Sequence, residues 1–234
     1  MTASETGSTN GINVYNEKPL HAALKQWYAL PEDQLETRVD GYIIDLVRGD
    51  LLVEIQTGSF SPLKRKLARL VETHPVRLVY PIPLEKWILT RFPDDPRPPT
   101  RRKSPKHGHY AHVFSQLVYL PLLMLNPNFS LEVLLTREEE VRRPVIKKHA
   151  RSKGCLTEER RLLEVVENRV FQNPGDLLEL LPSDLADPFT VHMLAKSMRQ
   201  PVWLAQKAVY SLRGMEAIRA EGKKGRSNLY SKAR

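Results

Sequence analysis

Cysteine is almost absent from this chain, because Cys155 is the only one among 234 residues. A lone cysteine excludes an internal disulfide framework and a zinc site built from several thiolates, and it suits the reducing cytoplasm. Long apolar runs are missing as well. The longest, VFSQLVYLPLLML, is interrupted by Ser115, Gln116 and Pro121 and is too short to span a hydrocarbon core of roughly 30 Å. We therefore expect no membrane segment.

Negative charge is also in short supply. The chain has 36 Lys and Arg against 27 Asp and Glu, which gives a net charge of +9. Such an excess favours a polyanionic partner, although charge alone does not distinguish DNA, RNA and lipid. With 41% hydrophobic residues the chain can nevertheless bury a core. Residues 1–14 lack the order of a secretory signal and are expected to form a loose tail.

A regular alternation of elements is predicted for the N-terminal half. Apolar residues at helical spacing mark two helices, and short apolar runs bounded by turn residues mark four strands. The expected elements are, in order, a helix from Pro19 to before Pro31, strands at 35–39, 41–48 and 51–57, a helix with Leu63, Leu67, Leu70 and Val71 on its buried side, and a strand at 76–82.

Two strands of this series carry acids among apolar residues. In GYIIDLVRGDLLVEIQTG, residues 41–58, a two-residue turn at Gly49 and Asp50 sets Arg48 opposite Leu51. Counting outward then places Asp45 opposite Glu54, with Asp45, Glu54 and Gln56 on one face of the sheet. Facing carboxylates repel each other unless a cation lies between them, and Mg²⁺ prefers such oxygen ligands. The alternative is that both acids face solvent from a half-exposed hairpin.

This hairpin and its flanking elements resemble the PD-(D/E)XK phosphodiesterase superfamily, over roughly residues 15–83. The resemblance implies an α/β fold with a restriction-endonuclease-like mixed sheet flanked by helices. It also implies Mg²⁺ or Mn²⁺ as the cofactor and hydrolysis of phosphodiester bonds. Asp45 and Glu54 match the metal-binding acids, and the carbonyl of Ile55 would be a further ligand.

Several positions depart from the pattern of that superfamily. Gln56 occupies the place of the catalytic lysine and cannot supply its positive charge, so either Lys64 or Lys66 of the following helix substitutes for it or the activity is weak. Glu17 is the candidate for the acid that the first helix often contributes. The Pro-Asp dipeptide is absent, and Asp40 is an alternative metal ligand that strand parity disfavours.

The middle of the chain has weaker patterns. Residues 92–108 are dense in proline and basic side chains and predict an irregular loop. A helix near 110–125 and a strand near 131–137 extend the first domain, and REEEVRR at 137–143 is predicted to be a salt-bridged surface stretch. His109 and His112 could share a helix face and bind a metal, although histidines in such a loop more often have a structural role.

The C-terminal third is predicted to be mostly helical. TEERRLLEVVENRVF, residues 157–171, has the composition of a helix capped by Thr157. Two further helices divided at residues 199–201 have the pattern of a helix-turn-helix. Two strands around a Gly-Lys-Lys-Gly turn at 222–225 would form a basic wing.

These features predict a winged helix that binds DNA. Residues on the exposed side of the second helix would enter the major groove, and cations of the wing would contact phosphates. The predicted contacts are Trp203, Gln206, Lys207, Tyr210 and Arg213 in the helix and Lys223, Lys224 and Arg226 in the wing. A winged helix that contacts proteins is the alternative.

Taken together, the sequence predicts a cytoplasmic, metal-dependent DNA endonuclease, with duplex DNA as its partner and a homodimer left open. Two other functions fit the same sequence: a non-catalytic DNA-binding regulator with a degenerate nuclease fold, and an RNA-processing nuclease. The expected domains are a tail at 1–14, a nuclease-like domain at 15–143 with an extension at 84–143, a basic linker at 144–156 and a small, mostly α winged-helix domain at 157–234.

Overall fold

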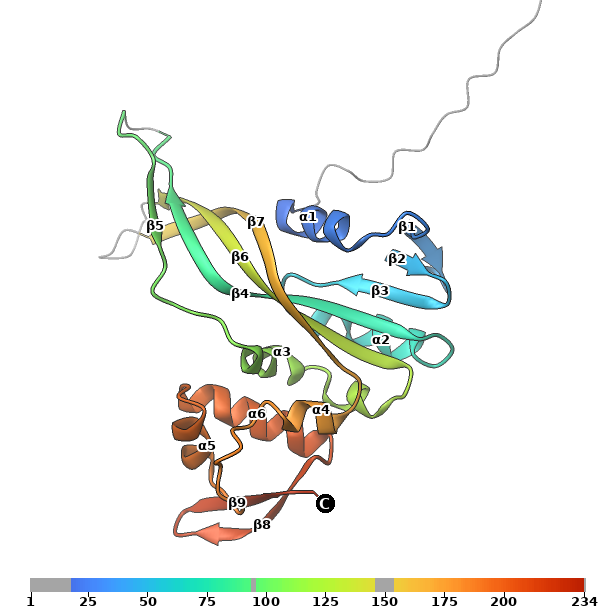
Figure 1. Cartoon of the computed structure of the whole chain (residues 1–234), viewed down its shortest axis with the longest axis vertical. Helices are drawn as coiled ribbons and strands as arrows, with labels where there is room; N and C mark the ends of the chain where they lie inside the picture. Colours follow the sequence, from blue (N-terminus) through green and yellow to red (C-terminus); the bar gives the residue numbers. More distant parts are fainter. Residues whose placement is uncertain (1–17, 94–95, 146–153, 234) are drawn as a thin grey trace, which may run out of the picture.

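The computed structural model describes residues 18–93, 96–145 and 154–233. Within these ranges the protein is a mixed α/β protein with one large sheet, helices against it and a helical C-terminal region (Figure 1). The N-terminal elements are α1 (Pro19–Tyr28), β1 (Gln34–Val39), β2 (Tyr42–Arg48), β3 (Leu51–Ile55), the 3-10 helix η2 (Ser61–Leu63) and α2 (Lys64–Leu70). The central elements are β4 (Val76–Thr90), β5 (Thr100–Lys103), η3 (Tyr110–Val113), α3 (Phe114–Leu117), η4 (Pro121–Leu125), β6 (Phe129–Val145) and β7 (Gly154–Phe171).

The described strands of the large sheet lie in the order β1-β2-β3-β4-β6-β7, and β5 pairs with β4. The first three strands form an antiparallel meander. β4 runs parallel to both β3 and β6, and β7 closes the sheet antiparallel to β6. The sheet is therefore mixed, as the sequence predicts.

Each face of the sheet has its own apolar cluster. On one face, Leu20 and Leu24 of α1 pack with Leu46, Val53 and residues of β4 and β6. On the other face, the buried residues of α2 and α3 pack with the remaining apolar side chains of the same strands. Fully buried side chains such as Phe60, Phe114 and Phe129 occupy this second cluster. The meander is thus held between α1 and α2.

The hairpin of β2 and β3 has the predicted register. Arg48 pairs with Leu51, and Gly49 in the turn has φ of 55°, in the left-handed region that glycine adopts readily. The paired residues continue outward to Leu46 and Val53, where the described ladder ends. Asp45 and Glu54 are the next residues beyond this last pair.

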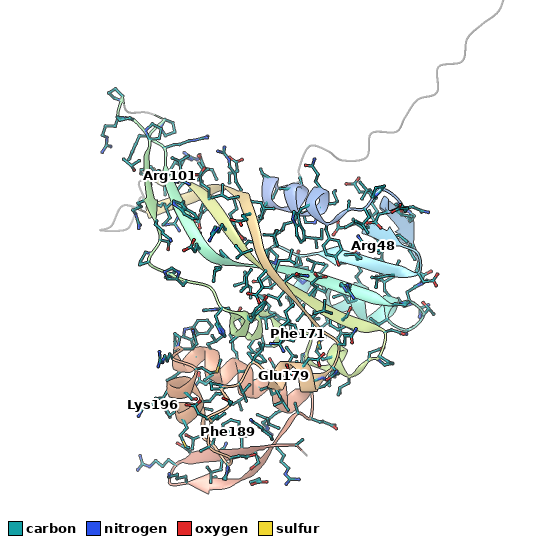
Figure 2. The ribbon with its side chains drawn as sticks, in the orientation of Figure 1. Arg48, Arg101, Phe171, Glu179, Phe189 and Lys196 are labelled. Atoms are coloured by element: carbon teal, nitrogen blue, oxygen red, sulfur yellow. The ribbon has the colours of Figure 1, made fainter. Side chains whose placement is uncertain are left out.

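The C-terminal region continues from the sheet through α4 (Pro174–Leu178), α5 (Val191–Ser197), α6 (Val202–Gly214), β8 (Ile218–Lys224) and β9 (Ser227–Lys232). Figure 2 shows Phe171 between the sheet and these helices, and Phe189 between α5 and the β8–β9 hairpin. Both side chains are fully buried and belong to the cluster that includes α2 and α3. The C-terminal region therefore shares its core with the sheet.

The prediction of a helix at 157–171 is wrong, because these residues form most of β7. Their strand pairing brings Arg160 and Arg161 to the buried glutamates of β6, and this tertiary requirement overrides helix propensity. The predicted linker at 144–156 is also affected, since Pro144 and Val145 end β6 and Gly154 begins β7. Residues 146–153 lie outside the described ranges. The C-terminal helical region consequently starts after Phe171 rather than at Thr157.

The glutamates at 138–140 were predicted to be at the surface, and this is also wrong. They are buried within β6, where each has cationic partners. Glu138 pairs with Arg160, Glu139 with Arg101 and Arg161, and Glu140 with Lys86 and Arg142. Their predicted ion pairs exist, and most of them join β6 to a neighbouring strand, with the carboxylates buried and the cationic partners partly exposed.

Four other predicted segments differ from the structure. β4 and β6 are much longer than the predicted strands at 76–82 and 131–137 because they pair with each other over most of their length. The predicted loop at 92–108 contains β5. The predicted helix at 110–125 is divided into η3, α3 and η4, and Pro121 begins the last of these. No helix in the described ranges has both the length and the apolar character needed to cross a membrane.

Candidate functional site

The open end of the β2–β3 hairpin brings together two carboxylates, one from each strand. The Ile55 amide donates a hydrogen bond of 2.8 Å to Oδ2 of Asp45. A side chain thus takes the place of the β2 carbonyl that would continue the ladder. The same Oδ2 lies 3.3 Å from Nε2 of His21, on α1. Asp45 is therefore fixed from β3 and from α1.

Glu54 is held from the opposite side of the sheet. Its Oε1 lies 2.5 Å from Nζ of Lys66, on α2, and the contact is an ion pair without good hydrogen-bond geometry. The Lys66 ammonium also donates to the carbonyl of Ile43 on β2. The Glu54 side chain is only 7% exposed, and that of Lys66 is 17% exposed. Strand parity alone predicts one shared face for the acids, but their contacts are divided between α1 and α2.

The two acids have opposite shifts in pKa. Burial, followed by the charge of Asp45, raises the pKa of Glu54 to about 7, and Lys66 only partly offsets these two effects. Burial also acts to raise the pKa of Asp45, but the hydrogen bond and charge of His21, with the Ile55 amide, outweigh it. The pKa of Asp45 is consequently below its ordinary value. Near neutral pH, Asp45 is therefore ionised, whereas Glu54 exchanges between its protonated and ionised forms.

Other predicted site residues have different positions. Gln56 follows β3, and its amide nitrogen donates to the carbonyl of Ser59 at 2.5 Å. Lys64 is exposed at the start of α2, so Lys66 is the lysine beside the acids. Asp40 lies in the turn between β1 and β2 and contacts His74 at 3.1 Å. Glu17 lies outside the described residues.

His21 is the site residue that the sequence did not reveal. It sits one residue after Leu20 on α1, and its ring nitrogen reaches Asp45, 24 positions away in sequence. The available signal was its place beside the buried stripe of α1, which alone does not name a partner. His109 and His112, by contrast, cap η3 through hydrogen bonds with backbone amides. In the described part of the chain, no group of three or more His, Cys, Asp and Glu side chains could hold a metal ion.

A hollow of about 670 Å³ lies next to His21 and Gln56, although neither Asp45 nor Glu54 lines it. The start of α1, the segment after β3 and the start of β7 form its walls. His21 and Gln56 line it, so it touches the partners of Asp45 and the residue that follows Ile55. Its size is that of a typical small-ligand site.

The predicted DNA-contacting residues of the C-terminal region are mostly exposed. On α6, Trp203 is 48% and Tyr210 61% exposed, and Gln206 and Arg213 are also at the surface. Lys207 is an exception, because its ammonium donates to the Ser115 carbonyl of α3 at 3.2 Å.

The wing differs from its prediction in detail. Lys223 and Lys224 belong to β8, and the turn is formed by Gly225 and Arg226, since Lys224 pairs with Ser227. All three cations, Lys223, Lys224 and Arg226, are exposed. Their positions therefore leave them accessible to a partner.

The fold and the site describe a class of protein, namely a mixed α/β protein with two carboxylates near the end of a hairpin. The chain belongs to the family described as "Domain of unknown function (DUF8091)", which matches residues 18–172. A protein of Treponema pallidum (strain Nichols), named "Uncharacterized protein", is 30% identical over 222 residues, covering 94% of this chain and 87% of that protein. No solved structure matches the chain. The family match ends just after β7, at residue 172. The similarity to the Treponema protein covers 222 residues and therefore extends into the C-terminal region.

Proposed function

We propose that this protein is a metal-dependent nuclease that hydrolyses phosphodiester bonds in DNA. The order of elements supports the proposal: α1, an antiparallel meander, α2 and a parallel strand follow one another as the resemblance to the PD-(D/E)XK superfamily implies. The acids at the hairpin end occupy the matching positions. The restriction-endonuclease-like fold is part of this proposal.

One observation carries the proposal, which is the ion pair of Lys66 and Glu54. Gln56, just after β3, stands where the superfamily has a lysine, and Lys66 of the next helix would supply the missing ammonium group, 2.5 Å from the glutamate. An ammonium group here would stabilise negative charge that develops on a phosphate. Gln56 can accept a hydrogen bond from a water through its side-chain carbonyl.

The donor set fits a hard divalent ion. Asp45 and Glu54 supply carboxylate oxygens, and Mg²⁺ is commonly held by one or two carboxylates, with water and substrate phosphate as the other ligands. Mg²⁺ or Mn²⁺ would lower the pKa of bound water and so supply a nucleophile at neutral pH. His21 orients Asp45 and favours its ionised form. The Ile55 carbonyl is proposed as an additional ligand.

The C-terminal region would deliver duplex DNA to this site. α5 and α6 form consecutive helices joined by a short turn, and the β8–β9 hairpin carries exposed cations. Exposed Trp203, Gln206, Tyr210 and Arg213 on α6 can contact DNA, whereas Lys207 would first have to leave Ser115. We include the wing residues Lys223, Lys224 and Arg226 as phosphate contacts.

A non-catalytic DNA-binding regulator is the second candidate. The observation that favours it is that both acids and the glutamine have partners within the chain: His21 and the Ile55 amide for Asp45, Lys66 for Glu54, and Ser59 for Gln56. A site whose polar groups satisfy one another can persist without a metal ion.

The deciding experiment compares the wild-type protein with Asp45→Asn on plasmid, single-stranded DNA and duplex RNA, with Mg²⁺ or Mn²⁺. Asp50→Asn is the matched control, since Asp50 is exposed in the turn of the same hairpin. We expect metal-dependent cutting of DNA by the wild type and Asp50→Asn, and its loss in Asp45→Asn. DNA binding without cutting by any variant would assign the regulator. Preferential cutting of RNA would assign an RNA-processing nuclease.

A further inference from the structure

A second hollow, of about 230 Å³, lies between β4, the segment before η3, α3 and β7. Its polar walls are rich in groups that donate hydrogen bonds or carry positive charge, and none of its lining residues is acidic. These lining side chains are Tyr80, Lys86, Lys106, His107, His112 and Arg160. A concave site with this composition favours an anion over a cation or an apolar ligand.

The cations of the hollow differ in how far they are already neutralised. Nζ of Lys86 lies 2.6 Å from the Glu140 carboxylate. Arg160 donates three hydrogen bonds to Glu138, one from Nε and two from Nη2. Lys106 and His107 are exposed, and no carboxylate of the described residues lies within ion-pair distance of either. Lys106 therefore supplies a charge that a ligand would compensate, and His107 supplies a ring N–H donor.

The segment that carries Lys106 and His107 is held tightly against β4. The Ser104 amide donates to the Lys86 carbonyl at 2.7 Å, and the Gly108 amide donates to the Leu84 carbonyl at 3.1 Å. A Cβ atom on Gly108 would lie 2.3 Å from the Pro83 carbonyl oxygen, a distance that only glycine avoids. The backbone of Lys106 and His107 is thus fixed from both sides, and a ligand would have to order only their side chains.

Arg160 connects this hollow with the carboxylate site. It lines both hollows, and its guanidinium donates to the Thr57 carbonyl at 2.9 Å, immediately after Gln56. Arg160 is therefore the residue that the two hollows share. A strand that occupies the hollow beside His21 and Gln56 would pass Arg160 to reach Lys106.

We propose that the hollow between β4 and the Ser104–Gly108 segment binds a phosphate group of a nucleic-acid strand, with Lys106 and His107 as its principal contacts. This inference rests on the proposed function, because it names where the strand beside the cutting site is held. The volume is smaller than that of typical small-ligand sites of about 300 to 1,000 Å³, so it suits a phosphate group better than a whole nucleotide. Lysine, histidine and tyrosine all donate to phosphate oxygens. The phosphate is either an internal diester or a terminal monoester of the strand.

Binding of a short oligonucleotide without metal tests this site separately from catalysis. The probe is a single-stranded DNA of about 12 nucleotides with a 3′ dye, carrying a 5′ phosphate or a 5′ hydroxyl, measured by fluorescence anisotropy in EDTA. We compare the wild type with Lys106→Gln/His107→Gln, with Lys106→Arg, and with Arg38→Gln. Arg38 is an exposed cation on β1, and its loss removes one positive charge elsewhere.

We expect the double variant to bind about fivefold to tenfold more weakly than the wild type. The slope of the logarithm of the binding constant against the logarithm of the salt concentration should become shallower by about 0.7 for each lost phosphate contact. Lys106→Arg should retain most of the binding, and Arg38→Gln should match the wild type. Equal losses for both oligonucleotides would identify an internal diester, and a loss confined to the 5′-phosphorylated probe would identify a terminal phosphate. A double variant that binds like the wild type, or a wild type that does not bind at low salt, would overturn the proposal. Since no metal is present, failure of cutting in the Asp45 experiment does not affect this result.

Discussion

Lys66 illustrates how one side chain can join two strands and a helix. Its ammonium group lies against Glu54 of β3 and the Ile43 carbonyl of β2, while its backbone belongs to α2. Removal of the lysine would leave Glu54 buried without its opposite charge. A buried carboxylate without a partner destabilises the fold or takes up a proton.

We therefore predict that Lys66→Met lowers metal-dependent cutting by about a hundredfold or more, the scale expected for loss of a positioned charge in a reaction site. Arg65→Met, an exposed neighbour on the same helix, should change the rate little. Rates would be measured on plasmid DNA for variants whose circular dichroism matches the wild type. Equal rates for Lys66→Met and the wild type would remove Lys66 from the proposed mechanism.

Glu140 provides a prediction of pH dependence. Burial acts to raise its pKa, but hydrogen bonds from Arg142, Lys86 and Thr157 prevail and lower it from 4.5 to about 2. Because the folded-state pKa lies below the unfolded value, the ionised carboxylate stabilises the fold above about pH 4.5. That contribution is lost as the pH falls toward 2.

Glu140→Gln should accordingly lower the free energy of unfolding by about 1 to 3 kcal/mol at pH 7. The difference from the wild type should shrink by more than half at pH 3. Urea unfolding of both proteins at the two pH values measures it. Glu164→Gln is the control, since the Glu164 side chain is half exposed beside Arg137 and should matter little at either pH. A difference that did not change with pH would contradict a lowered pKa of Glu140.

At the scale of elements, the contact of Gly108 with β4 has a clear consequence for stability. Gly108→Ala would press a methyl group against the Pro83 backbone, and relief of this overlap must shift the whole Ser104–Gly108 segment. We predict a loss of about 1 to 3 kcal/mol in the free energy of unfolding. Gly58→Ala is the matched control, because a Cβ there meets nothing within 4 Å. Chemical denaturation of both variants measures the difference, and equal stabilities would show that the segment yields freely.

The sequence predicts the elements whose signals are local. The β2–β3 hairpin follows from period-two alternation and a Gly-Asp turn, and the observed pairing of Arg48 with Leu51 confirms it. β7 does not follow, because Glu, Arg and Leu favour a helix in isolation and its strand form depends on the buried glutamates of β6. The length of β4 likewise comes from its pairing with β6.

The candidate site was predictable to a similar degree. The register placed Asp45 and Glu54 beside each other, and the charge of Asp45, which acts to raise the pKa of Glu54, agrees with that proximity. Of the two lysines considered, only packing of α2 on the sheet selects Lys66. His21 was missed because its contact with Asp45 depends on how α1 is rotated against the sheet, and spacing along one helix does not fix that rotation.

At the scale of the whole molecule, the shared core predicts cooperative unfolding. One apolar cluster includes Leu67 of α2, Phe171 of β7 and Leu212 of α6. Among the three tryptophans, Trp203 reports on α6, and Trp27 and Trp87 report on α1 and β4. We predict that Trp203→Phe and the Trp27→Phe/Trp87→Phe double variant show tryptophan-fluorescence transitions in urea that coincide with their circular dichroism transitions. A fluorescence transition displaced from the circular dichroism transition in either protein would indicate that the C-terminal region unfolds independently.

The order of the strands bears on how the chain is made. Apart from β5, the described strands of the large sheet lie side by side in the order of synthesis, so each new strand can join an edge that the previous one has just formed. Until the next strand emerges from the ribosome, that edge exposes unpaired backbone groups that invite association with other nascent chains. α1 is the exception, because it is made first yet packs against Leu162 and Val165 of β7. The contacts of the first helix with β2, β3, β4 and β6 can form earlier, but its docking is completed only when the last strand of the sheet has joined.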